Sequence, residues 1–229
     1  MNTHGKKHKQ AIKKVDKTKS YPLIDAIELI KTTNYTKFDG TVELAVNLAI
    51  DPRRAEQNVK GATALPNGLG KEVKLVVFAK GEKAIEAKEA GADFVGQEDL
   101  MKKIQDGWLG FDRVIATPDM MSVVGRLGKI LGPRSLMPNP KLGTVTFDLK
   151  HTIKESKQGR AEFKTEKAGI IHTSVGKVSM ASDKLKENIQ AVMETVIKLK
   201  PATSKGHYIK KISLSATMSP GVKVDPSSF

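Results

Sequence analysis

The sequence contains no cysteine, few aromatic residues and no long apolar run. Without cysteine the chain cannot form disulfides, thiolate metal sites or cysteine nucleophiles, which is typical of a protein of the reducing cytoplasm. A helix needs about 20 consecutive apolar residues to span a bilayer, and no such stretch is present. The first 20 residues are rich in lysine and lack the apolar core of a secretory signal. We therefore expect a cytoplasmic protein and exclude an integral membrane protein.

Acidic residues are scarce relative to basic ones: 25 Asp and Glu stand against 39 Lys and Arg, which gives a net charge of +14 in 229 residues. The excess lies at the two ends, because residues 1–20 carry +6 and residues 151–229 carry +7, whereas residues 21–70 carry −1 and residues 71–150 carry +2. A basic surface built from both ends would attract a polyanion. Nucleic acid is the leading partner; an anionic membrane surface and solvated charge without a partner are the alternatives.

The apolar pattern distinguishes the middle of the chain from its flanks. Residues 42–50 alternate apolar and polar side chains, which predicts a strand with one buried face. From residue 71 onward strands alternate with helices, with strands expected at 73–78, 92–95 and 113–116 and helices at 82–90, 99–105 and 120–130. Such alternation predicts a parallel sheet with right-handed crossovers, as in a small Rossmann-like unit.

Amphipathic strands return after about residue 150. Residues 161–165 and 169–176 read as a hairpin, and a long helix begins near Ser182. The last strand is expected over 208–216, with a bulge near Ile212 because its alternation slips by one residue.

The expected fold class is therefore a two-domain protein that combines α/β and α+β architecture. Residues 1–68 plus 159–229 would form a split α+β domain, and residues 69–158 an inserted Rossmann-like three-layer α/β domain. Two chain crossings that carry Gly68, Gly70 and Gly159 would make a hinge. A single fused domain is the alternative.

The sequence carries no recognisable catalytic motif. Gly68-Leu69-Gly70-Lys71 resembles a phosphate-binding loop, but Glu72 stands where a hydroxyl is required and a strand follows instead of a helix. The pair His4 and His8 lacks the intervening glutamate of a hydrolytic zinc site, and no nucleophile elbow is present. We expect no enzyme activity, no cofactor, no metal and no small-molecule substrate. A nucleotide-dependent enzyme that uses the middle unit is the rival interpretation.

Residues 131–145 are the most unusual stretch, with three prolines and two glycines that fix the path of a long loop. Arg134 and Lys141 add positive charge to it. The loop is either a rigid connector or a stiff basic finger that approaches phosphates, and its residues do not decide between the two.

The same stretch resembles the signature of the bacterial large-subunit ribosomal proteins of the universal L-one family. The signature matches are GKILGPR at 128–134, LMPNPK at 136–141 and GTV at 143–145. Shorter matches extend over nearly the whole chain, at 37–38, 41–43, 51–53, 59–61, 169–173, 176–177, 205–206, 208–211 and 217–218. Ser135 and Ser219 stand where the family usually has glycine, which alone accepts a positive φ without cost.

The resemblance implies a two-domain protein that binds 23S rRNA, forms the mobile stalk near the tRNA exit site and assists release of deacylated tRNA. It also implies repression of the protein's own operon through its mRNA leader or intercistronic region. Its partners would be 23S rRNA, tRNA at the exit site and that mRNA, with no membrane, and the free protein would be a monomer. A free translational repressor that never enters a ribosome is a further alternative.

The resemblance also implies which residues bind RNA. The positions carried over are Lys37, Phe38, Thr41, Glu43, His172, Thr217, Met218 and Ser219, with Arg134 and Lys141 as possible secondary contacts. Phe38 and Met218 would offer apolar platforms to a ribose or base, and the Thr217 hydroxyl could bond a 2′-hydroxyl or phosphate. The alternatives are core packing for Phe38, and a plain strand end before Pro220-Gly221 for Thr217 and Met218.

Overall fold

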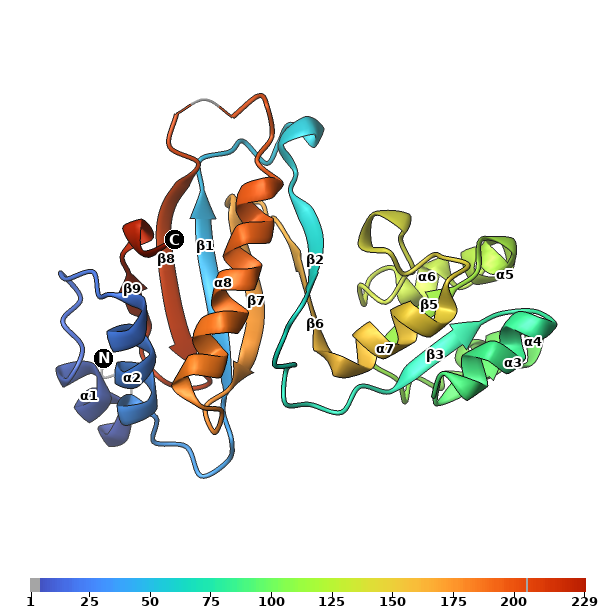
Figure 1. Ribbon diagram of the computed structural model, residues 1–229, viewed down its shortest axis with the longest axis horizontal. Coiled ribbons are helices and arrows are strands. Elements are labelled where there is room, and N and C mark those ends of the chain that lie inside the picture. Colours follow the sequence, from blue (N-terminus) through green and yellow to red (C-terminus); the bar gives the residue numbers. More distant parts are fainter. Residues whose placement is uncertain (1–4, 205) are drawn as a thin grey trace. The chain divides into compact units, whose positions relative to one another are not determined.

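Two compact units make up the computed structural model, which describes residues 5–204 and 206–229 (Figure 1). Unit 1 comprises the described residues up to Gly70 together with Ala161–Phe229, and unit 2 comprises Lys71–Arg160. His4 and Lys205 lie outside the described residues. Both units mix helices with sheets, so the expected α/β and α+β fold class is confirmed.

Unit 1 is built on a four-stranded antiparallel sheet in the order β7-β1-β8-β9. The strands are β1 (Thr41–Leu48), β7 (Ile170–Lys177), β8 (Ile209–Ala216) and β9 (Val222–Val224). The N-terminal strand β1 lies between two strands from the C-terminal part of the chain. The expected bulge is present, because Asn47 faces Lys211 and Leu48 faces Ile209, so that Lys210 is skipped.

Helices α2 (Leu23–Thr33) and α8 (Ser182–Lys198) contact each other and pack on one face of this sheet (Figure 1). The inward side chains of β1 are fully buried there, as the alternation predicted: Val42, Leu44, Val46 and Leu48. A shorter helix, α1 (Lys6–Lys13), precedes α2 and was not expected from the sequence.

The expected hairpin over 161–176 is wrong. Strand β6 (Arg160–Lys164) pairs with β2 (Lys60–Ala64) in a separate two-stranded sheet, while β7 pairs with β1. Between β6 and β7 there is one isolated bridge, from Thr165 to Ile171, beside a tight turn. Turn chemistry predicted the reversal correctly, but strand partners are chosen by tertiary packing, which the local sequence does not reveal.

Unit 2 contains a parallel three-stranded sheet in the order β4-β3-β5, as the strand–helix alternation predicted. The strands are β3 (Leu75–Phe78), β4 (Phe94–Gly96) and β5 (Arg113–Ala116). Apolar clusters on the two sheet faces involve α3 (Glu82–Glu89) and α7 (Leu149–Gly159) on one side, and α4 (Glu98–Gln105), α5 (Met121–Gly125) and α6 (Gly128–Leu131) on the other. The unit therefore has three layers.

Two helices of unit 2 differ from the sequence expectation. The single helix expected over 120–130 is divided into α5 and α6, because Gly125 and Gly128 weaken the helix and Leu127 N donates to Val124 O at 2.9 Å in a tighter turn. Helix α7 was not expected, because the strands expected after residue 150 begin only at residue 161. Short 3₁₀ turns complete the chain at Ala55–Gln57, Pro118–Met120, Pro140–Leu142 and Pro226–Ser228.

Candidate nucleic-acid interface

The sheet of unit 1 has one face that α2 and α8 do not cover. Residues paired across neighbouring strands share a face, so the outward residues follow from the register. Glu43 faces Ser174 and Ser215, Ala45 faces His172 and Ser213, and Asn47 faces Lys211. Lys223 of β9 continues the row through Ser213. This open sheet face therefore carries serine hydroxyls, the Asn47 amide, His172 and lysines, together with Glu43, Ala45 and Ile170.

Positive charge is distributed across the open sheet face. Lys177 faces Thr41 and donates from Nζ to the Thr41 hydroxyl at 2.9 Å, while Lys211 and Lys223 lie on the other side of β1. Glu43 lies among serine hydroxyls, where a carboxylate suits a base amine or a 2′-hydroxyl and disfavours a phosphate. The face can thus attract a polyanion and still discriminate among polar groups.

A turn after β8 lies at the end of this face. Thr217 N donates to Thr41 O at 3.0 Å, and Thr41 N donates to the Thr217 hydroxyl at 3.0 Å. The hydroxyl that was expected to meet RNA is thus also engaged with the β1 backbone, and Thr217 fixes the turn. Met218 follows with φ +67° and is 65 % exposed, which places its side chain in solvent.

Phe38 is 57 % exposed, so core packing does not explain it. Its carbonyl accepts a hydrogen bond from the Thr36 hydroxyl at 2.9 Å, which orders the loop before β1. Lys37 is exposed beside it. Phe38 and Met218 are thus large apolar side chains offered to solvent from neighbouring segments, since Tyr35 in the same loop donates to the Met218 carbonyl at 2.6 Å.

Two expected RNA-binding positions differ in exposure. His172 is exposed on the open sheet face, and its Nε2 lies 3.9 Å from a carboxylate oxygen of Glu166. The Ser219 hydroxyl is buried and has no hydrogen-bond partner in the described chain, while Ser219 N closes the turn on Ala216 O at 2.8 Å. Ser219 therefore contributes to the turn and does not present its hydroxyl on the surface.

Arg134 and Lys141 lie in unit 2, on the proline-rich loop. The loop folds onto that unit's core through Leu131 and Leu142, and its end is fixed by Asn139 N, which donates to the Thr144 hydroxyl at 2.7 Å. Arg134 is exposed on this ordered support. These contacts hold the loop on unit 2 and agree with either interpretation of it.

Sequence reasoning missed several members of the open sheet face. Lys211 and Lys223 belong to strands whose neighbours become known only from the register, and Tyr35 was not singled out at all. Alternation along β8 could have placed Lys211 on the sheet face opposite to that of the buried Ile212. The bulge at Lys210 interrupts the alternation and obscures this pattern.

The chain passes between the units twice. At each crossing, contacts hold the chain to one unit before the crossing and to the other unit after it, and these contacts are called anchors. Gly68 O accepts from the buried Asn188 amide at 2.9 Å within unit 1. Within unit 2 the Lys71 ammonium donates to Asp112 at 2.6 Å, which lowers the pKa of that carboxyl. Only residues 69–70 separate these anchors. At the other crossing Arg160 O accepts from Arg113, and the next residue, Ala161, is already buried in the core of unit 1.

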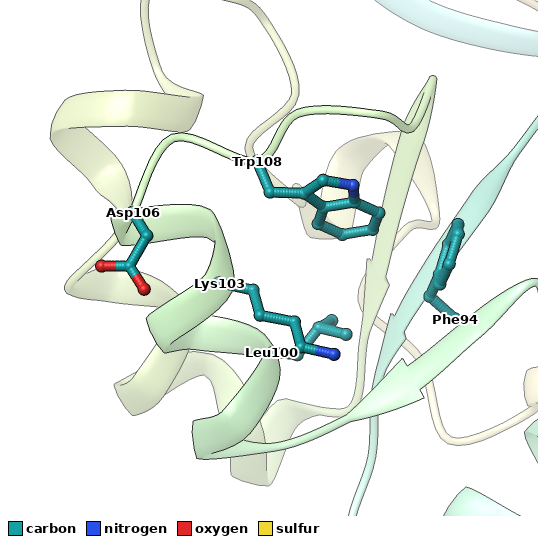
Figure 2. Close-up of a pocket in the computed structure, with 5 residues that line it drawn as sticks. All are labelled: Phe94, Leu100, Lys103, Asp106 and Trp108. Carbon is teal, nitrogen blue, oxygen red and sulfur yellow. The ribbon is translucent and has the colours of Figure 1, made fainter.

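Unit 2 contains a hollow of about 440 Å³ that none of the expected RNA-binding residues line (Figure 2). Phe94 of β4 and Trp108 meet edge to face with ring centroids 4.7 Å apart, and Leu100 of α4 lies below them. Gly110 packs close to the indole, since a Cβ there would meet Trp108 Nε1 at 3.1 Å. Lys103 and Asp106 are the charged residues at its wall.

The described residues also bear on metal binding and membrane insertion. Within residues 5–204 and 206–229, no cluster of three or more His, Asp or Glu side chains could hold a metal ion. No described helix is long and apolar enough to cross a membrane.

Comparison with known protein families identifies the family of the chain. Residues 29–220 match the model of the ribosomal protein L1p/L10e family, which covers most of the chain. The chain belongs to this family. L1p/L10e proteins are structural RNA-binding proteins and not a family of enzymes, so this protein is a constituent of the large ribosomal subunit in the cytoplasm and binds rRNA.

Proposed function

We propose that this L1p/L10e protein binds its rRNA on the open sheet face of unit 1 and the adjoining Met218 turn. The observation that carries the proposal is the combination of a basic, hydroxyl-lined face with two solvent-exposed apolar side chains, Phe38 and Met218. Lysines neutralise phosphates on any RNA, whereas the uncharged groups select a folded RNA through its riboses and unstacked bases. The contact residues are Lys37, Phe38, Thr41, Glu43, His172 and Met218, with Thr217 and Ser219 shaping the turn.

The rRNA is proposed to be a 23S segment that forms the mobile stalk near the tRNA exit site, where the protein would assist release of deacylated tRNA. An mRNA leader that imitates the rRNA would occupy the same surface and repress translation of the protein's own operon. Both proposals extend the rRNA-binding role of the family. Arg134 and Lys141 supply a secondary contact on unit 2.

Movement at the two crossings is proposed to accompany this role. Gly68, Gly70 and Gly159 all have positive φ, at +68°, +67° and +109°. Leu69 packs on the core of unit 1, so free rotation is confined to Gly70 and to the link between Arg160 and Ala161. A hinge of so few residues would leave each unit internally rigid.

The test is a filter-binding titration of the full chain against a large-subunit rRNA fragment at fixed salt. Phe38→Ala removes an exposed ring without leaving a cavity, so we expect unchanged thermal stability and an affinity about tenfold lower, as loss of a stacked base contact predicts. Phe147→Ala is the matched control, because Phe147 is 54 % exposed on unit 2. Equal affinities of wild type and Phe38→Ala would contradict the proposal that this surface binds rRNA. The mRNA leader should compete with the rRNA and show the same dependence on Phe38.

A further inference from the structure

Helix α1 lies beside the Met218 turn, and His8 joins the two by a hydrogen bond. His8 Nδ1 lies 3.2 Å from Met218 O, and the Tyr35 hydroxyl donates to the same carbonyl at 2.6 Å. The His8 and Tyr35 rings meet edge to face with centroids 6.2 Å apart. One carbonyl thus connects the lysine-rich N-terminal segment, the loop before β1 and the turn after β8.

The helix is fixed on unit 1 by one side and offers lysines on the other. Ala11 and Val15 are buried, and Val15 belongs to the main core of unit 1. The exposed residues of the segment include Lys6, Lys7, Lys9, Lys13 and Lys14. None of these five lysines forms an ion pair with a described residue. Their charge is therefore not neutralised within the described chain and remains directed at solvent.

The Met218 backbone needs support to hold its conformation. A φ of +67° is the left-handed region, which costs a non-glycine residue free energy, and Met218 is the third residue of the turn closed by Ser219 N and Ala216 O. The hydrogen bonds from Tyr35 and His8 to the Met218 carbonyl compensate for that cost. They also fix the direction in which the exposed Met218 side chain projects.

We infer that α1 is a second RNA-contacting element, which binds phosphates beside the Met218 turn, and that Tyr35 and His8 are positioning residues that couple the two. The inference rests on the proposed function, since it extends the same RNA surface. Lys6, Lys9 and Lys13 are spaced by three and four residues, so they form one row along the helix. That row is suited to follow consecutive phosphates of one RNA strand.

The first experiment measures how affinity for the rRNA fragment depends on salt. Lys6, Lys9 and Lys13 are changed together to Gln, and Lys184, Lys198 and Lys200, which are exposed on and after α8, are changed to Gln as the control with the same loss of charge. We expect the α1 variant to lose about tenfold in affinity near 0.1 M salt and its slope of log K against log salt to fall by about two. The control should retain the wild-type slope. Equal slopes for wild type and the α1 variant, or equal losses in the two variants, would overturn the inference.

The second experiment is a double-mutant cycle between Tyr35→Phe and Met218→Ala. If Tyr35 acts through Met218, Tyr35→Phe lowers affinity several-fold in the wild type and has no effect in the Met218→Ala background. Additive losses would contradict the positioning role. The affinity of the wild type distinguishes the two proposals. If the wild type does not bind the rRNA fragment, the proposed function is contradicted. If the wild type binds and the variants bind with the same affinity, only the role of α1 is contradicted.

Discussion

Ser135 and Met218 are the non-glycine residues of the described chain with a left-handed backbone, at φ +58° and +67°. Ser135 stands where the resemblance implies glycine, so the expected strain is present there. At the other replaced position, Ser219, the positive φ falls on its neighbour Met218. One strained residue thus lies on the proline-rich loop of unit 2 and the other on the Met218 turn of unit 1.

The strain at Ser135 predicts an order of stability for unit 2. A β-branched residue suits a positive φ worse than serine, so Ser135→Val should lower the free energy of unfolding by about 1–2 kcal/mol. Ser135→Gly should equal or slightly exceed the wild type, because relief of strain is partly offset by greater freedom of the unfolded chain. Denaturant titration followed by Trp108 fluorescence measures both. Ser122→Val, at an exposed helical position of the same unit, controls for the change in side chain.

Tyr208 is a buried residue whose hydroxyl has no hydrogen-bond partner in the described chain. Phenylalanine keeps the ring and removes the unpaired group, so Tyr208→Phe should raise the free energy of unfolding by about 1 kcal/mol. Urea titration near pH 7 checks this. A loss of stability on that change would show that the hydroxyl is satisfied in solution.

The same residue predicts a dependence on pH. Burial raises the pKa of Tyr208 to about 12, whereas an unfolded tyrosine ionises near its ordinary value of 10.0. Between these values the unfolded chain releases a proton that the folded chain keeps, so the tyrosine's contribution to stability falls as pH rises. The stability gap between Tyr208→Phe and the wild type should therefore widen above pH 10. A constant gap from pH 8 to pH 12 would refute the shift.

One buried amide on helix α8, that of Asn188, connects the segment that leads into unit 2 with the sheet of unit 1. Asn188 donates to Gly68 O at 2.9 Å and to Val175 O at 2.8 Å, and it accepts from Asn67 N at 3.1 Å. Asn188→Leu leaves all three backbone groups unpaired and should lower the free energy of unfolding of unit 1 by about 3 kcal/mol. Thermal and urea denaturation measure the change. Lys184→Gln on the exposed side of α8 should have no effect.

Elements with a strong local pattern were predictable, and those defined by distant partners were not. The alternation of β1 and the apolar run of β3 identified both strands, because each pattern reports burial directly. Strand β2 was missed because its partner β6 lies about a hundred residues away, and α1 was missed because its lysines conceal a short buried stripe. At the site, Phe38 and Met218 came from the family resemblance. Lys223 could be assigned to the open sheet face only from the strand register.

The aromatic residues are divided between the two units of the molecule. Trp108 is the single tryptophan and lies in unit 2, while Tyr21, Tyr35 and Tyr208 all lie in unit 1. Each unit has its own apolar cores, so we expect two unfolding transitions, one followed by tryptophan and one by tyrosine fluorescence. Asn188→Leu should shift only the tyrosine transition, and Ser135→Val only the tryptophan transition. Equal shifts of both signals would indicate a single cooperative unit.

The position of β1 between β7 and β8 has a consequence for synthesis of the chain. Strand β1 ends at Leu48, but the first strand that pairs with it, β7, begins only at Ile170. By contrast, the strands of unit 2 have all been synthesised once Ala116 is added, and its last helix once Gly159 is added. In a growing chain, unit 2 can therefore fold while β1 is still unpaired. Since Thr217 completes the turn against Thr41, the open sheet face and the Met218 turn are complete only when the final strands emerge. If this surface binds rRNA as proposed, unfinished chains would not compete with finished ones for the nascent ribosome.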